Sequence, residues 1–215
     1  MAVSASRSFA LPADERAGGY DALYEASGVL WPARPGRMVV HATEQLEPGR
    51  ALDLGCGDGK NIVFLERGGW AVDGLDVSES ALAGARRRLL AEGHELRGSL
   101  WRGNAATWRP STTYDLILVY GLLHCLTDAE AVAACRTAKD ALRPGGLLAL
   151  ASFDDRSPVP AGHRTGPLVL RSQAAIRRLV EGLVPVMWES GVIVESHPPL
   201  VPSHRHSMLW GLLRR

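Results

Sequence analysis

The sequence ALDLGCGDGKN spans residues 51–61 and decides the fold of the chain. It begins with a short apolar run, Ala51–Leu54, which is typical of a buried strand. Glycines follow at positions 55, 57 and 59; glycine adopts positive φ angles without steric cost and lets the backbone approach a ligand closely. Residues 60–67 then have a helical pattern. A strand, a glycine-rich turn and a helix in this order indicate a nucleotide-binding turn in an open α/β sheet.

Short apolar runs and helical segments alternate along the rest of the chain. We expect strands at 70–75, 100–102, 114–120, 147–153, 184–194 and 206–213, and helices at 79–92, 128–142 and 172–182. Strands that alternate with helices are typical of a parallel sheet that helices cover on both faces. The sequence therefore predicts an α/β, doubly wound fold with a mostly parallel seven-stranded sheet.

The chain is expected to contain one domain with an N-terminal extension. Residues 1–40 show no clear hydrophobic period and form a predicted helical arm, whereas residues 41–215 form the domain. Within the domain, residues 154–170 are rich in proline, glycine and aspartate and follow the end of a strand. Because binding loops occur at such strand ends, we expect this segment to be a substrate loop.

Composition narrows the class of protein. The 215 residues are 46% hydrophobic and 22% charged, with a formal net charge of +1. This argues against intrinsic disorder and against a dedicated nucleic-acid binder, and no apolar run approaches the ~20 residues of a membrane span. The three cysteines are too few and too scattered for a disulfide framework or a zinc site, and no secretory signal follows Met1. We therefore expect a cytoplasmic protein without a structural metal.

An acidic residue completes the nucleotide-binding pattern. The second strand is followed by Asp76, whose carboxylate can accept hydrogen bonds from both hydroxyls of a ribose. Dinucleotide sites use the spacing G-x-G-x-x-G to seat a pyrophosphate. Here the spacing is G-x-G-x-G with Asp58 inside the turn, and an acid beside a pyrophosphate would be repulsive. This pattern favours a cationic nucleoside such as S-adenosylmethionine over NAD.

Five stretches resemble the class I S-adenosylmethionine-dependent methyltransferases. They are ALDLGCGDGKN (51–61), GLDVS (74–78), GNAATW (103–108), YDLILVYGLLHCL (114–126) and LRPGGLLALASF (142–153). The segment YDALYEASGVLWPARP (20–35) and the C-terminal HRHSMLWGLLRR (204–215) are most similar to the small tellurite-resistance and thiopurine-type branch. The resemblance implies a Rossmann-like fold and in-line transfer of a methyl group from S-adenosylmethionine.

The resemblance also implies which residues bind the cofactor. Asp53, Gly55 and Gly57 would line its methionine part, with Cys56 contributing backbone within the same turn. Asp76 would hold the ribose.

The remaining implied contacts concern the adenine, the methyl group and a lid. Val77 would pack on adenine, Asn104 stands where many relatives have an aspartate that faces the adenine amino group, and Ala105 would offer its backbone amide. Tyr120 would face the reacting methyl group. Trp31 and Arg34 resemble a Trp-x-x-x-Arg-Pro arm that folds over the cofactor, although the spacing here is one residue shorter.

Two histidines are candidates for catalysis. His124 follows the fourth strand near the expected methyl position, where it is either a general base or a packing residue. His163 lies in the predicted substrate loop, where it contacts substrate or is solvated. A further group, His197, His204 and His206, lacks a nearby cysteine, and we expect it to belong to the closing strands rather than to bind a metal.

The sequence thus predicts methyl transfer from S-adenosylmethionine to a small-molecule acceptor, such as a metabolite, natural product or xenobiotic. The stretch VYGL (119–122) lacks the Asn/Asp-Pro-Pro-aromatic pattern of base-modifying enzymes. The alternatives are a protein that binds the cofactor without turnover and an NAD(P)-dependent reductase, the latter opposed by the glycine spacing. We expect a monomer or homodimer without nucleic-acid or membrane partners, and the acceptor atom stays open.

Overall fold

A single seven-stranded sheet organises the molecule. The computed structural model describes residues 20–22, 24–25, 34–158, 168–197 and 201–215. The strands are β1 (Arg50–Leu54), β2 (Ala71–Asp76), β3 (Leu100–Arg102), β4 (Tyr114–Tyr120), β5 (Leu142–Phe153), β6 (Val184–His197) and β7 (Val201–Arg214). Their order is β3-β2-β1-β4-β5-β7-β6, and β7 runs antiparallel to both of its neighbours. The predicted seven-stranded, mostly parallel sheet is confirmed.

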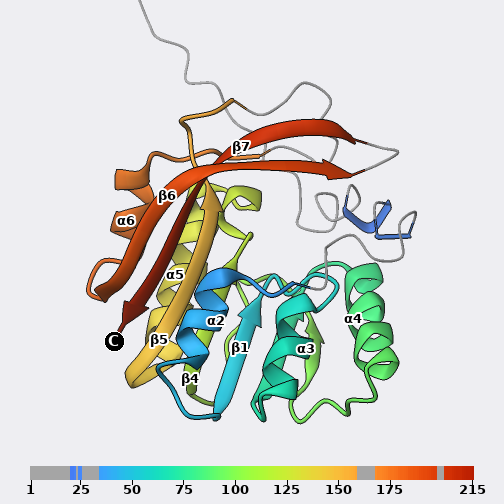
Figure 1. Cartoon of the computed structure of the whole chain (residues 1–215). Coiled ribbons are helices and arrows are strands. Elements are labelled where there is room, and N and C mark those ends of the chain that lie inside the picture. Colours follow the sequence, from blue (N-terminus) through green and yellow to red (C-terminus); the bar gives the residue numbers. More distant parts are fainter. Residues whose placement is uncertain (1–19, 23, 26–33, 159–167, 198–200) are drawn as a thin grey trace, which may run out of the picture.

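Helices cover both faces of this sheet (Figure 1). They are α2 (Arg37–Thr43), α3 (Lys60–Arg67), α4 (Glu79–Ala91), α5 (Asp128–Ala141) and α6 (Gln173–Leu179), with a short 3₁₀ turn, η1 (Leu123–Cys125). One apolar core joins α5 and α6 to the sheet, and a second joins α2, α3 and α4 to its other face. Neighbouring residues of β4 alternate between the two cores, Ile117 in the first and Leu118 in the second, because side chains alternate along a strand.

Local sequence signals set the ends of the helices. The predicted helix at 60–67 has those bounds in α3. Ser78 caps α4 by accepting a hydrogen bond from the backbone N–H of Ala81 at 3.0 Å. Thr127 and Glu130 form a capping box that starts α5. These caps place the turns that follow β2 and β4, and both turns border the site described below.

One helix spans the predicted boundary between the arm and the domain. In the structure this helix is α2, which begins at Arg37 and buries Met38, Val39 and Ala42 against the sheet. The predicted boundary at residue 40 therefore falls inside α2. Residues 20–22 and 24–25 are helical as well.

The two last strands are longer than the sequence pattern indicates. β7 pairs with β5 only between Met208 and Arg214, whereas its pairing with β6 continues outward as far as His197 opposite Val201. The outer half of this hairpin is therefore a two-stranded ribbon, which curves over the carboxyl ends of the parallel strands (Figure 1). Among the described helices, none has the length and apolar character needed to cross a membrane.

Candidate active site

The glycine-rich turn lies at the carboxyl end of β1, between β2 and β4. Gly55, Gly57 and Gly59 have φ angles of 73°, 55° and 79°, a region that favours glycine. The N–H groups of Gly55 and Cys56 both donate to the Leu75 carbonyl, at 2.8 and 3.0 Å. A Cβ atom on Gly59 would lie 2.7 Å from the Cβ of Ala85. The glycines are thus required both by the backbone conformation and by close packing.

Asp53 presents a buried carboxylate beside this turn. Its residue is 1% exposed, and neither carboxylate oxygen has a hydrogen-bond partner among the described residues. Burial raises the pKa of Asp53 to about 7 and Asp76 adds to the rise, while the nearby Asn61 amide and the charge of Lys60 offset only part of it. A buried polar group without a partner is costly. The positively charged amino group of S-adenosylmethionine is a suitable partner, so the site fits this cofactor.

Asp76 connects the glycine-rich turn to the turn after β2. One of its oxygens accepts a hydrogen bond from the Gly57 N–H at 2.8 Å, and the other accepts one from the Ser78 N–H at 3.0 Å. Burial raises the pKa of Asp76, and these two N–H donors oppose the rise. Because each carboxylate oxygen can accept a second hydrogen bond, Asp76 retains capacity for ribose hydroxyls.

Asp58 does not face the ligand, and the inference that its charge selects a cationic nucleoside was wrong. Its carboxylate points to α4 and accepts a hydrogen bond from Arg88 at 2.6 Å. Both groups are largely buried, since the side chains are 1% and 10% exposed. The arginine compensates the charge of Asp58. The carboxylate that suits a cationic ligand is that of Asp53, in the strand rather than in the turn.

The residues assigned to adenine lie after β2 and β3. The Gly103 N–H donates to the Asp76 carbonyl at 2.9 Å, which brings the two strand ends together. Asn104 stabilises its own turn, because its side-chain oxygen accepts from the Ala106 N–H at 2.9 Å. Ala105 is buried beside it, and Val77 directly follows Asp76. Their contacts with adenine stay a prediction.

Described residues of the N-terminal arm reach two of these turns. Asp21 accepts a hydrogen bond from the Ser78 hydroxyl, and the hydroxyl of Tyr20 lies 3.4 Å from the sulfur of Cys125. The arm therefore contacts the turn after β2 and the turn after β4. Arg34 is exposed, and Trp31 lies outside the described residues.

Tyr120 ends β4 and packs under the beginning of α2. A side chain at Gly36 would collide with the Tyr120 ring. Burial raises the pKa of Tyr120, while the backbone N–H groups of Arg37 and Met38 lower it by hydrogen bonding. The hydroxyl is thus directed toward the first turn of α2, and only the ring is available to the active-site side of the strand.

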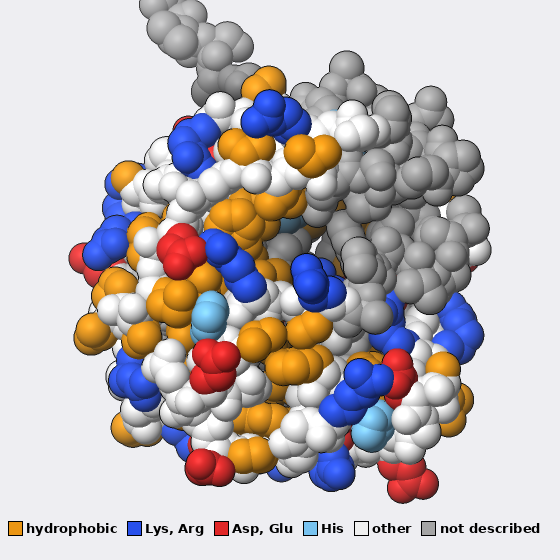
Figure 2. All heavy atoms as spheres, in the orientation of Figure 1, with side chains coloured by type: hydrophobic (Ala, Val, Ile, Leu, Met, Phe, Trp, Pro, Cys, Tyr) orange, Lys and Arg blue, Asp and Glu red, His pale blue; other side chains and the backbone are white. Residues whose placement is uncertain are grey.

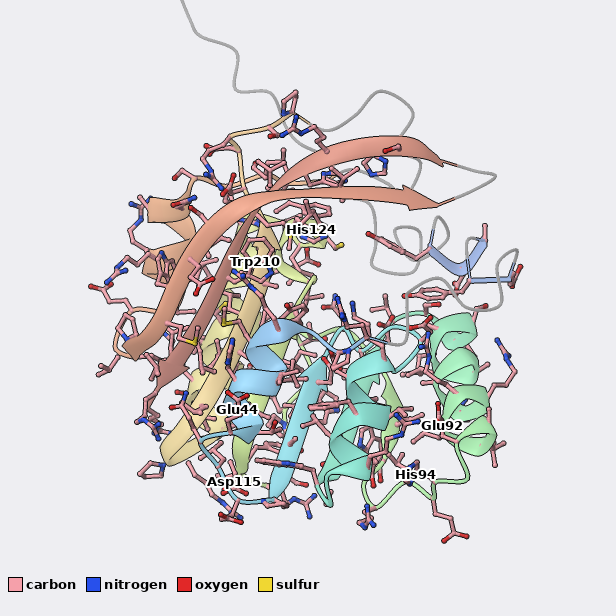
Figure 3. The ribbon with its side chains drawn as sticks, in the orientation of Figure 1. Glu44, Glu92, His94, Asp115, His124 and Trp210 are labelled. Atoms are coloured by element: carbon pink, nitrogen blue, oxygen red, sulfur yellow. The ribbon has the colours of Figure 1, made fainter. Side chains whose placement is uncertain are left out.

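His124 belongs to a stack of three rings. It is 4% exposed, and its centroid lies 4.0 Å from that of Phe153, at the end of β5. The other face of Phe153 stacks on His206 of β7 at 3.9 Å, and His204 meets His206 edge-on at 4.7 Å. Figure 3 shows His124 beneath the hairpin. The Phe153 N–H donates to Nδ1 of His124 at 3.4 Å, which favours the neutral tautomer with its proton on Nε2.

The C-terminal half of the site contains residues that no sequence motif indicated. Asp154 accepts hydrogen bonds from Arg156 and Gln173, and its carbonyl accepts one from Ser207. Arg171 is buried and donates to backbone carbonyls near His124. Asp154 begins the predicted substrate loop, whereas Arg171 and Ser207 were missed because isolated polar residues outside a motif give no local signal. His163 lies outside the described residues.

The described side chains also include no group of three or more histidine, cysteine, aspartate or glutamate residues placed to hold a metal ion. The site at the carboxyl ends of the strands thus consists of the carboxylates of Asp53 and Asp76 and the ring stack around His124.

Comparisons with known proteins point to one family. A family model described as a methyltransferase domain matches residues 51–146. Thiocyanate methyltransferase 1 of Arabidopsis thaliana is 29% identical over 191 residues, which are 87% of this chain and 80% of the relative. Probable thiol methyltransferase 2 of the same plant is 28% identical over 155 residues, 70% of this chain and 69% of the relative.

Solved structures show the same fold. TehB from Haemophilus influenzae superposes with a TM-score of 0.71 at 18% identity, covering 92% of this chain and 67% of that one. The N-methyltransferase NodS from Bradyrhizobium japonicum WM9, in complex with S-adenosylhomocysteine, has a TM-score of 0.65 at 20% identity, with 83% and 84% covered. An NAD(P)-dependent reductase is no longer an alternative. Residues 51–146 therefore match a methyltransferase domain, and over most of its length the chain is similar to methyltransferases.

Proposed function

We propose that the chain transfers a methyl group from S-adenosylmethionine to a small molecule. The observation that carries this proposal is the buried carboxylate of Asp53, which lies without a hydrogen-bond partner among the described residues at the end of β1. A small acceptor is supported by the surroundings of the site, since the arm and the β6–β7 hairpin of the same chain both reach the carboxyl ends of the strands. On the face seen in Figure 2, the described residues carry interspersed charges of both signs. They do not form the continuous basic surface that is typical of nucleic-acid binding.

We assign the cofactor contacts as follows. Asp53 binds the ammonium group, and Asp76 binds the ribose hydroxyls. The backbone of Gly55, Cys56 and Gly57 surrounds the methionine part. Val77, Asn104 and Ala105 surround the adenine, and Arg34 belongs to the arm that covers the bound cofactor.

The chain promotes transfer by alignment and by exclusion of water. Bound S-adenosylmethionine supplies an activated methyl group, whose departure leaves a neutral thioether. The ring of Tyr120 and the stack of His124 on Phe153 form the acceptor side. For a protonated acceptor, His124 can take the proton only through a ring nitrogen that does not already carry one. An acceptor that arrives as an anion needs no base.

A sulfur nucleophile is the acceptor class to test first. The relatives named as thiocyanate and thiol methyltransferases support it, at 29% and 28% identity. Such nucleophiles react as anions, so their methylation requires no general base. Cytoplasmic location and a monomeric or homodimeric state stay predictions.

Two measurements test the proposal. Calorimetry should show binding of S-adenosylmethionine and S-adenosylhomocysteine but not of NADPH. A labelled-methyl assay with thiols, thiocyanate, amines, phenols and carboxylates should then show turnover with at least one acceptor, and the Asp53→Asn variant should bind the cofactor weakly. Tight cofactor binding without transfer to any acceptor would favour a binding protein instead.

A further inference from the structure

Arg171 lies buried against the turn that carries His124. It precedes α6 and is 8% exposed. Its guanidinium donates to the Leu123 carbonyl at 2.6 Å and to the Leu126 carbonyl at 2.7 Å. A third N–H donates to the Asp128 carboxylate at 2.8 Å. One side chain thus binds both ends of η1 and the first residue of α5.

The planar guanidinium explains why an arginine occupies this position. A 3₁₀ turn of three residues satisfies few of its own carbonyl groups, and buried carbonyls need donors. Arginine presents several N–H groups in a fixed fork, so it can bind two carbonyls and a carboxylate together. A lysine has the same charge, but its single ammonium nitrogen cannot reproduce this fork. The position of Arg171 therefore requires the planar shape of the guanidinium as well as its positive charge.

Backbone contacts extend this arrangement to the end of β5. The Val169 N–H donates to the His124 carbonyl at 2.8 Å, and the Asp155 N–H donates to the Arg171 carbonyl at 3.1 Å. Arg171 also forms an isolated parallel bridge with Asp154. The segment around Arg171 is thus held between the His124 turn and the residues that follow β5.

The turn that Arg171 holds borders both halves of the active site. Leu122, at its start, packs on the glycine-rich turn, since a Cβ atom on Gly55 would lie 2.9 Å from its Cδ1. His124, in its middle, stacks on Phe153. A shift of this turn would therefore move the acceptor side relative to the cofactor-binding side.

We propose that Arg171 is a positioning residue for methyl transfer. Its guanidinium fixes the Leu123–Cys125 turn and thereby sets the His124 ring relative to Phe153. It acts through the turn and touches neither cofactor nor acceptor. The inference rests on the proposed function, in which the His124 side of the site receives the acceptor.

The Arg171→Lys variant tests this proposal, with Arg97→Lys as its matched control. Arg97 also binds a backbone carbonyl and a carboxylate, both of Glu66 at 2.9 Å, at the last turn of α3. We expect Arg171→Lys to lower kcat by about 10- to 100-fold, as misplacement of reacting groups does, with the cofactor Kd changed by less than about twofold. The NMR signals of the His124 imidazole should shift in this variant and not in Arg97→Lys.

The Asp128→Asn variant provides a second route, because the Asp128 side chain is 85% exposed and its loss should leave the chain folded. It should shift the His124 signals in the same direction and lower kcat less. Unchanged kcat and His124 signals in a folded Arg171→Lys would overturn the inference, as would an equal kcat loss in Arg97→Lys. If Arg171→Lys does not fold, unchanged His124 signals in Asp128→Asn would overturn it. If the wild-type chain methylates no acceptor, the proposed function fails, whereas the His124 signals still decide the role of Arg171.

Discussion

Two buried aspartates on neighbouring strands have opposite surroundings. Asp73, on β2, accepts hydrogen bonds from the Tyr114 hydroxyl at 2.8 Å, from Arg50 at 3.1 Å and from the Ser99 N–H at 2.9 Å. Asp53, on β1, has no hydrogen-bond partner among the described residues. Both are at most 6% exposed. The first carboxylate is satisfied by the fold itself, and the second is left for a ligand.

The same difference separates the two ends of the sheet. Near the amino ends of the strands, Asp115 binds Arg143 at 2.8 Å and the Arg50 N–H at 2.8 Å. Figure 3 shows Asp115 at the end of the molecule opposite His124. Acids with partners, such as Asp73 and Asp115, stabilise the fold, whereas Asp53 is the carboxylate that we propose for the cofactor. Residue type alone does not distinguish the two roles; the partners do.

The largest expected effect comes from Asp53→Asn. Removal of this carboxylate should weaken binding of S-adenosylmethionine by about 1.5–3 kcal/mol, the usual contribution of a hydrogen bond to a charged group. The cofactor-free protein should be no less stable at pH 8, because a buried charge without a partner is removed. Calorimetry measures the affinity and urea unfolding the stability. A variant that is less stable but binds with normal affinity would show that Asp53 has the structural role assigned to Asp73.

Asp73→Asn should have the opposite profile. Loss of its charge removes a buried acceptor of three hydrogen bonds, so the free energy of unfolding should fall by about 2 kcal/mol. The cofactor Kd should stay within about twofold of the wild-type value, since no residue of the glycine-rich turn contacts Asp73. A large change in Kd with unchanged stability would contradict the division of roles.

The pH dependence of stability tests the burial of Asp53 without a measurement of affinity. The folded-state pKa of Asp53 is raised to about 7 from 3.8, so folding retains a proton on this group. Its contribution to stability is full below about pH 4 and is lost as the pH rises through 7, by at most about 1.4 kcal/mol per pH unit. The difference between wild type and Asp53→Asn should show this slope. A difference that does not vary with pH would mean that Asp53 is not buried in the free protein.

The smallest effect is expected from Tyr114→Phe. This change removes one of the three donors to Asp73 and should cost about 1 kcal/mol of unfolding free energy. Cofactor binding should not change. Thermal unfolding with and without S-adenosylhomocysteine checks both statements. If the ligand no longer raised the Tm of this variant, the hydrogen bonds around Asp73 would extend to the cofactor site.

Local signals explain how much of this molecule could be predicted from its sequence. The strand, glycines and helix of residues 51–67 are set by periodicity and by backbone conformation, which depend on near neighbours. The direction of the Asp58 side chain depends on Arg88, which is 30 residues away in sequence and adjacent only after α4 has packed. No pattern within the turn could show that Asp53, and not Asp58, has the uncompensated charge.

The acceptor side was less predictable for a related reason. The last two strands were expected at 184–194 and 206–213, yet β6 and β7 pair as far as His197 and Val201. The ring stack joins His124, Phe153 and His206 from three separate elements, and its contacts exist only in the folded chain. Arg171 belongs to no motif, because its partners are backbone carbonyls, which every sequence contains.

The outer half of the β6–β7 hairpin gives the scaffold a modular region for engineering. Residues 192–197 and 201–207 pair with each other and not with β5, whose register with β7 begins at Met208. Sequence libraries confined to this ribbon can therefore vary the surface above the acceptor side while the strands that hold Asp53 and Asp76 keep their register. Under the proposed function, donor recognition and acceptor choice would be encoded in separate stretches of the chain.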